Sequence, residues 1–197
     1  MRAAGLLLTP GSNGDPDHPP LVAVQAAVEA RTGVPVRRFG FGSPGRGGRG
    51  PAPARTAVAR IRAEADRWAA ELGVEPGRLL LGGRSFGGRM ASVAVAEGQA
   101  AAGLVLLSYP LHPPGRRDGW RVEHLPRIEV PVLAVSGAND PYGSPEELSV
   151  AFADLGGPVQ HVTVAGAHVP RDPQEVADAV AAWVAASSGQ SQPGPSG

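Results

Sequence analysis

Short apolar runs alternate with longer helical segments along almost the whole chain, and this alternation restricts the fold more than any other feature. The runs are rich in Val and Leu, and most are apolar at consecutive positions, as in strands that helices cover on both faces. They lie at residues 4–10, 34–41, 78–83, 102–110, 130–137 and 159–166. Strands that alternate with helices predict an α/β sandwich with a mostly parallel sheet.

The segments between the runs have helical spacing, and three of them carry recognisable end signals. Gly33 is a good C-terminal cap for the first helix. Ser144 and Asp172 are N-cap residues, each followed by proline and then by acidic residues in the first turn. The predicted helices cover residues 21–33, 55–72, 86–98, 144–157 and 172–189. In the second, an apolar face is formed by Val58, Ile61, Ala65, Trp68 and Leu72.

Length and composition limit the class of protein. A chain of 197 residues fits one domain, which we expect at 1–186, followed by a disordered tail at 187–197 that is poor in apolar residues. The absence of cysteine excludes disulfides, thiolate zinc sites and a cysteine nucleophile. Basic and acidic residues number 18 each, so no net charge favours nucleic acid or an anionic membrane. Without a membrane-length run or a signal peptide, we expect a cytoplasmic protein.

The stretch "RLLLGGRSFGGRMAS" contains the strongest functional motif. Gly83 to Gly87 match G-x-S-x-G, with a predicted strand before the match and a predicted helix after it. That context is the one a nucleophile elbow requires, and it makes Ser85 a candidate nucleophile at the carboxyl edge of the sheet. The alternative is an ordinary strand-to-helix turn in which the serine is only an N-cap.

Partners for the serine follow two later strands. Asp140 stands just after the run at 130–137, and His168 just after the run at 159–166. Both are therefore predicted at the same sheet edge as Ser85, in the order serine, acid, histidine that α/β hydrolases use. Asp118, in the long connection at 111–129, is the second candidate for the acid.

An acyl-transfer site also needs backbone N–H groups to bind an oxyanion. We assign these to Phe86, which follows the serine, and to Ser12, in the loop after the first strand. Asn13, Tyr109 and His112 lie near the same strand ends, and we predict that they contact substrate. For His112 a role in a turn or on the surface is an equal alternative.

No cofactor or metal is expected. Residues 40–45 match G-x-G-x-x-G after a strand, but more Gly and Pro follow instead of the helix that a dinucleotide site needs. No His, Asp or Glu residues show metal-ligand spacing. The loop at 40–54 leaves the sheet at the candidate edge, so Arg46 and Arg49 are candidates to contact an anionic substrate.

Several strings resemble a known family: "LLLTPGSNGDPDHP", "LLLGGRSFGGRMAS", "LVLLSYPLHPPG", "VPVLAVSGANDPYG" and "VAGAHV". The chain is similar to compact α/β hydrolases of the testis-expressed protein 30 group and of a histone-acetyltransferase-complex subunit, and more distantly to dienelactone hydrolases. The resemblance implies a three-layer sandwich with six strands and no large cap domain. It also implies Ser85 as nucleophile, Asp140 as acid and His168 as base. The usual His-Gly pair of the first loop is Pro10-Gly11 here.

These observations predict a serine hydrolase that cleaves esters or thioesters of small acyl groups and needs no cofactor. The alternative is a noncatalytic protein-interaction module on the same fold, since relatives include a complex subunit. The expected partner is a small acyl substrate, and the sequence gives no oligomeric state.

Overall fold

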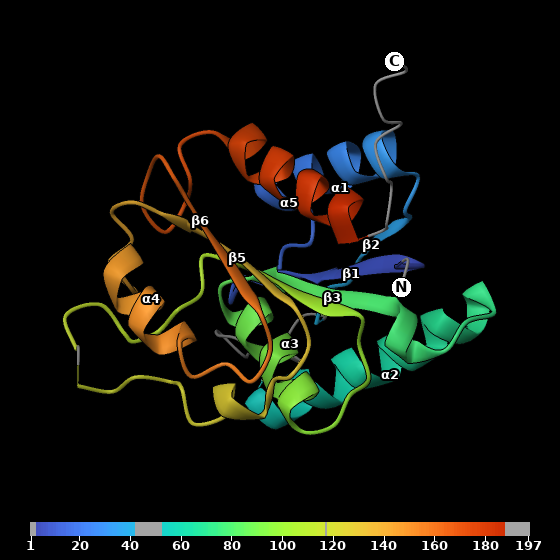
Figure 1. Cartoon of the computed structure of the whole chain (residues 1–197), viewed down its shortest axis with the longest axis horizontal. Helices are drawn as coiled ribbons and strands as arrows, with labels where there is room; N and C mark the ends of the chain where they lie inside the picture. The colour runs from blue at the N-terminus through green and yellow to red at the C-terminus, as the bar shows by residue number, and fades with distance from the viewer. Residues whose placement is uncertain (1–2, 42–52, 117, 188–197) are drawn as a thin grey trace, which may run out of the picture.

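The computed structural model describes residues 3–41, 53–116 and 118–187. Its centre is a six-stranded sheet in the order β2-β1-β3-β4-β5-β6, in which every neighbouring pair is parallel (Figure 1). The strands are β1 (Gly5–Thr9), β2 (Val36–Arg38), β3 (Leu79–Arg84), β4 (Gly103–Leu107), β5 (Val132–Gly137) and β6 (Val159–Val164). Each strand falls within or overlaps a predicted apolar run, so the expected parallel α/β sheet is confirmed.

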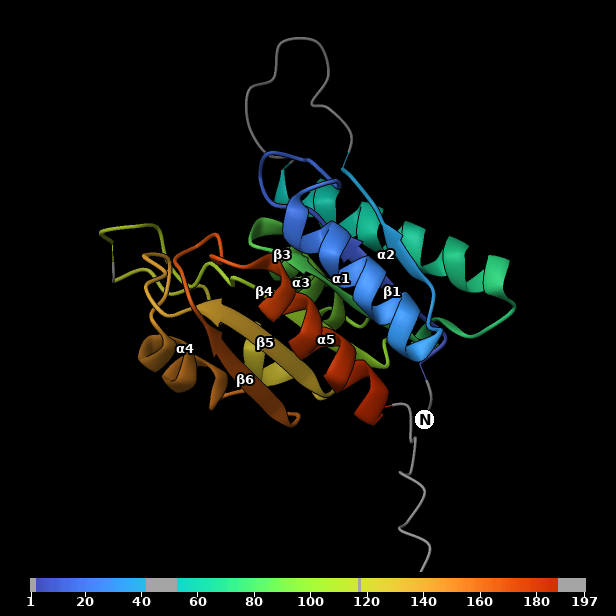
Figure 2. The ribbon, with the colours of Figure 1, turned by 90° about the horizontal axis from the view of Figure 1, so that it is seen from above.

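Helices cover both faces of this sheet. They are α1 (Pro19–Thr32), α2 (Ala54–Leu72), α3 (Phe86–Ala96), α4 (Pro145–Phe152) and α5 (Pro173–Ser187), with short 3-10 turns η1 (Pro76–Arg78) and η2 (Leu125–Arg127). Helices α1 and α5 pack together on one face, and α2, α3 and α4 lie on the other (Figures 1 and 2). The three predicted layers are therefore present.

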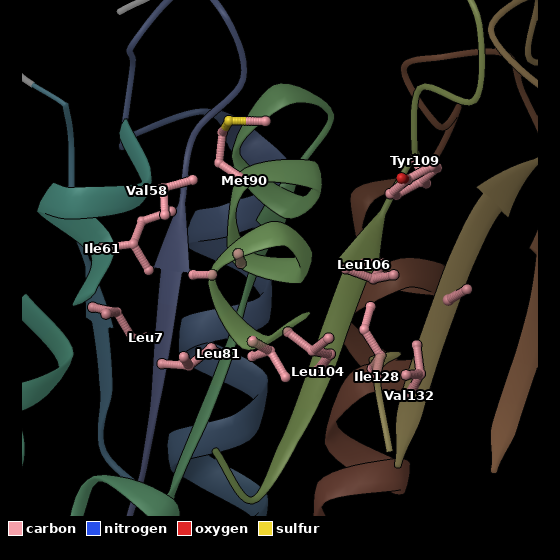
Figure 3. Close-up of a cluster of buried hydrophobic side chains, with 14 of the residues drawn as sticks. Leu7, Val58, Ile61, Leu81, Met90, Leu104, Leu106, Tyr109, Ile128 and Val132 are labelled. Atoms are coloured by element: carbon pink, nitrogen blue, oxygen red, sulfur yellow. The ribbon is translucent and has the colours of Figure 1, made fainter. Parts of the chain in front are cut away.

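Each face of the sheet has its own apolar core, because successive strand residues point to opposite sides. Leu7 and Leu81 point to the side of α2 and α3, where they pack with Ile61 and other apolar side chains (Figure 3). Leu6 and Leu80 point to the side of α1 and α5. Burial on both faces explains why the four inner strands, β1, β3, β4 and β5, read as continuous apolar runs rather than as alternating ones.

The helix-end signals act largely as predicted. Gly33 ends α1 in the left-handed conformation with a φ of 68°. Ser144 forms a capping box with Glu147 at the start of α4. That helix ends at Phe152, earlier than the predicted 157, and turns follow it before β6 begins. Gly157 donates a hydrogen bond to the Ile128 carbonyl, and a Cβ atom there would stand 2.4 Å from the Glu129 oxygen.

Leu72, assigned to the apolar face of α2, is 37% exposed because it is the last residue of the helix. Arg46, Arg49 and residues 188–197 of the predicted tail lie outside the described residues. Within the described ranges, no helix combines the length and apolar character needed to cross a membrane.

The strand order explains where a site can form. The chain passes from β1 to β2 on one side and then returns to place β3 on the other side of β1. The loop after β1 leads to α1 on one face of the sheet, and the loop after β3 leads to α3 on the opposite face. Loops that diverge in this way open a crevice at the carboxyl ends of the strands, where α/β proteins bind ligands.

Candidate active site

Ser85 lies in this crevice, on a strained turn between β3 and α3. Its φ is 50° and its ψ is −118°, an unfavourable conformation for a residue with a side chain. The glycines on either side are required by close backbone contacts. A Cβ atom at Gly83 would stand 2.3 Å from the Thr9 oxygen, and one at Gly87 would stand 2.3 Å from the Pro10 oxygen. The G-x-S-x-G spacing therefore lets the turn pack against the end of β1.

A continuous chain of hydrogen bonds joins Ser85, His168 and Asp140. The Oγ of Ser85 is 2.8 Å from Nε2 of His168, and Nδ1 of His168 is 2.9 Å and 3.0 Å from the two carboxylate oxygens of Asp140. Asp140 follows β5 and is buried, whereas the His168 side chain keeps 17% of its surface exposed. The three residues thus come from three strand ends and meet at one edge. A carboxylate on Nδ1 leaves Nε2 free to accept the serine proton.

Short loops hold these partners in place. Asp140 accepts a second hydrogen bond, from the Tyr142 N–H at 2.9 Å, and the Tyr142 ring stacks on the His168 ring with centroids 4.1 Å apart. A β-bridge between Gly166 and Pro170 closes the loop that carries His168. The Asn139 N–H donates a hydrogen bond to the Gly166 carbonyl and so joins this loop to the Asp140 loop. The histidine ring is therefore positioned from two sides.

The loop after β1 comes close to the serine. Gly11 lies where an added Cβ atom would be 3.7 Å from the Ser85 Cβ, and Ser12 and Phe86 both line the cavity beside it. Within the described ranges, no hydrogen-bond acceptor is paired with the N–H of Ser12 or of Phe86. Phe86 is the first residue of α3. The N–H groups of a helix's first turn have no partner within the helix, and they lie at the positive end of the helix dipole.

The cavity in front of Ser85 has a volume of about 500 Å³. Asn13, a predicted substrate contact, lines this cavity. Tyr109 and His112 do not, because both side chains are turned into the interior. Tyr109 packs edge-on against Phe152 and donates a hydrogen bond to the Arg121 carbonyl, and burial raises its pKa to about 12.

His112 is likewise 2% exposed. Its ring nitrogens lie 3.0 Å from the Pro113 carbonyl and 3.3 Å from the Glu147 carboxylate. This residue therefore ties the connection after β4 to the start of α4, instead of contacting the cavity. Asp118, the second candidate acid, is exposed, and His168 pairs with Asp140 instead.

Six residues that line the cavity were not predicted from the sequence, and they are His18, Arg84, Arg89, Pro110, Arg121 and Tyr142. A signal was available for His18: it is the N-cap of α1, and in a parallel α/β fold helix starts share the edge where strands end. Burial, followed by the positive charge of Arg84, lowers the pKa of His18, so its ring is biased to the neutral form.

The other two histidines have partners elsewhere. His124 is buried with Nε2 2.8 Å from the Ser92 hydroxyl, and burial, followed by the charge of Arg89, lowers its pKa to about 4. His161 lies in β6, 2.7 Å from the Ser136 hydroxyl, and burial lowers its pKa as well. Over the ranges that the structure describes, no three His, Asp or Glu side chains gather as metal ligands would.

A serine on a strained strand-to-helix turn, hydrogen-bonded to a histidine and through it to an aspartate, is the site architecture of α/β hydrolases. The family comparison agrees, because the model of the alpha/beta hydrolase domain family matches residues 2–181. The chain belongs to this family.

Solved structures of similar fold include several hydrolases. Est1E from Butyrivibrio proteoclasticus, with bound ferulic acid, is 21% identical, with a TM-score of 0.69 over 92% of this chain and 88% of its own. A Bacillus cereus carboxylesterase is 20% identical, with a TM-score of 0.63 over 94% and 89%. A dienelactone hydrolase from Anabaena variabilis is 17% identical, with a TM-score of 0.71 over 92% and 84%. These similarities extend over nearly the whole fold.

Proposed function

We propose that the protein is a serine hydrolase that cleaves esters or thioesters of small acyl groups, with Ser85, His168 and Asp140 as a catalytic triad. The observation that carries this proposal is the hydrogen-bond chain from Ser85 Oγ to His168 and on to Asp140. A serine hydroxyl is a weak nucleophile, and a base within hydrogen-bond distance is what activates it.

The first half of the reaction transfers the acyl group to the enzyme. As Ser85 Oγ bonds to the substrate carbonyl carbon, its proton passes to Nε2 of His168. Asp140 holds the imidazole in the required tautomer and stabilises its cationic form. The N–H groups of Ser12 and Phe86 bind the oxyanion, each contributing roughly 3 kcal/mol. The bond to the alcohol or thiol then breaks, and this leaving group takes the proton from His168.

The second half releases the acyl group by hydrolysis. Water loses a proton to His168 as its oxygen bonds to the acyl carbon, and a second tetrahedral intermediate forms at the same oxyanion site. When the bond to Ser85 Oγ breaks, the proton returns to the serine and a carboxylic acid leaves. The cavity volume of about 500 Å³ supports small substrates.

Membership of the alpha/beta hydrolase domain family and the esterases among the similar structures support this activity. Within the family we assign the chain to the testis-expressed protein 30 group, on the strings "GGRSFGGRMAS" and "SYPLHPPG". The resemblance to that group does not indicate a substrate, so we infer the substrate class from the cavity itself.

The test is turnover of a panel of phenyl esters and acyl thioesters by the wild type and by Ser85→Ala. We expect Ser85→Ala to lose at least a thousandfold in kcat/KM while its circular dichroism stays native. Ser108→Ala is the matched control, because Ser108 directly follows the neighbouring strand β4, also has a φ of 50°, and does not line the cavity. Equal activity of Ser85→Ala and wild type would overturn the assignment. A folded wild type without any turnover would instead favour the noncatalytic interaction module.

A further inference from the structure

We propose that the substrate carries an anionic oxygen group, a carboxylate or a phosphate, in addition to its scissile acyl bond, and that Arg89 and Arg121 bind this group. The inference rests on the proposed hydrolase function and names its substrate class. It comes from the charges of the cavity, which the sequence motifs did not indicate.

Of the residues that the structure describes, three arginines and no aspartate or glutamate line the cavity beside Ser85. Arg84 is the last residue of β3, Arg89 lies one helical turn after Ser85 in α3, and Arg121 belongs to the connection between β4 and β5. The start of α3 adds the positive end of its helix dipole at the same place. A small cavity that concentrates positive charge in this way favours an anionic ligand.

These arginines differ from the paired arginines elsewhere in the molecule. Arg31, Arg37, Arg38 and Arg67 each form ion pairs with aspartate or glutamate side chains. No such ion pair joins Arg84, Arg89 or Arg121 to a described residue. The residues outside the described ranges contain no Asp or Glu either, so they have no side-chain carboxylate to contribute.

Two of the three guanidiniums also contain a buried donor without an acceptor. The Nε atoms of Arg84 and Arg89 are removed from solvent and have no hydrogen-bond partner among the described residues. Leaving a buried charged donor unpaired destabilises a protein. Both arginines line the cavity.

The three arginines have different roles. Arg84 contacts the catalytic residues, because its Nη2 donates a hydrogen bond to the His168 carbonyl at 3.2 Å. Burial lowers the pKa of Arg84, and the negative charge of Asp140 opposes this shift. Among the described residues, the Arg121 guanidinium has only a long contact of 3.5 Å, to the Pro110 carbonyl. Burial, followed by the charge of Arg89, lowers the pKa of Arg121, so these two cations are close enough to repel each other.

An anionic oxygen group between Arg89 and Arg121 would offset this repulsion and accept hydrogen bonds from the two guanidiniums. The planar guanidinium fork matches both carboxylate and phosphate oxygens. The group would then hold the substrate by its charged end, with the acyl carbon directed to Ser85.

The experiment compares matched anionic and neutral esters. One pair, 4-acetoxybenzoate and its methyl ester, places the charge on the leaving group, and 4-acetoxyphenyl phosphate replaces the carboxylate by phosphate. A second pair, monophenyl adipate and phenyl hexanoate, places the charge on the acyl side. We expect the wild type to favour the anionic member of at least one pair in kcat/KM. Arg89→Gln and Arg121→Gln should reduce that preference about ten- to hundredfold.

Arg60→Gln is the matched control, since Arg60 is exposed on α2, is outside the cavity lining and loses the same charge. Its preference for the anionic ester should equal that of the wild type. A wild type that hydrolyses both members of every pair equally would overturn the anion site while leaving the hydrolase intact. So would Arg89→Gln and Arg121→Gln variants that keep the full preference.

Binding separates the two proposals when no ester is cleaved. Calorimetry on Ser85→Ala with 4-acetoxybenzoate measures the anion site without turnover. Binding that Arg89→Gln weakens at least tenfold, and that added salt weakens as well, would support the site even if the hydrolase proposal failed. Absence of binding to a folded Ser85→Ala protein would overturn the anion site.

Discussion

Replacing Ser85 by glycine and, separately, by alanine isolates the backbone strain at the nucleophile. Both variants lose the hydroxyl and its hydrogen bond to His168, so that loss cancels in the comparison. What remains is the conformation, with a φ of 50° and a ψ of −118°. Glycine adopts positive φ readily, whereas alanine keeps the steric cost of its Cβ atom.

The size of the effect follows from two opposing terms. A non-glycine residue in such a sparsely populated region costs about 1–3 kcal/mol. Glycine loses about 0.5–1 kcal/mol more than alanine in conformational freedom on folding. Strain relief therefore outweighs the entropy term, and Ser85→Gly should be more stable than Ser85→Ala by roughly 1 kcal/mol. In a domain of this size that difference raises Tm by about 2–4 °C.

Urea unfolding of both variants, followed by circular dichroism, measures the difference if the m-values agree. Ala63→Gly is the control, because Ala63 is exposed in the middle of α2 and should lose about 1 kcal/mol there. A Ser85→Gly protein that is less stable than Ser85→Ala, by an amount like that of the control, would refute strain at this turn.

Three further predictions concern packing, catalysis and pH. Gly87→Ala places a Cβ atom 2.3 Å from a backbone oxygen of the loop after β1 and should lower the free energy of unfolding by about 1–3 kcal/mol. Gly77→Ala, whose Cβ atom would have its nearest contact at 3.8 Å, should change this free energy little, and urea titration measures both variants. Asp140→Asn should reduce kcat about ten-thousandfold with an unchanged fold, because His168 loses its tautomer control; only a small loss would contradict this role. The pKa of His124 is lowered from 6.5 to about 4 in the folded protein, so between these pH values the unfolded chain binds a proton that the folded chain does not. As the pH falls from 6.5 to 4, the wild type should therefore lose about 1–3 kcal/mol more stability than His124→Gln. Parallel curves of stability against pH would exclude the effect.

Much of the fold could be predicted because its signals are local. Strands buried on both faces read as apolar runs. Gly33 marked the end of α1, and Ser144 marked the start of α4. In a parallel sheet every strand ends at the same edge, so residues just after strands were expected together there. Ser85, Asp140 and His168 do meet at that edge, with hydrogen bonds between them.

The wrong and the missing site residues depend on side-chain direction, which cannot be read from a residue's position along a strand or loop. Tyr109 and His112 follow β4 at the correct edge, but their side chains turn inward, Tyr109 to the Arg121 carbonyl and His112 to Glu147 of α4. Arg84 and Arg89 flank the nucleophile, and their long side chains reach the cavity. Arg121 comes from a connection without regular spacing, so only the folded chain brings it to the site.

The central claim is that Ser85 is an activated nucleophile, and a fluorophosphonate probe tests it most directly. The purified protein is treated with the probe, and the adduct is mapped by mass spectrometry in the wild type, Ser85→Ala and His168→Ala. We predict one adduct on Ser85 in the wild type, none on Ser85→Ala and strongly slowed labelling of His168→Ala. A folded wild-type protein that remains unlabelled at Ser85, or that labels equally well without His168, would contradict the account.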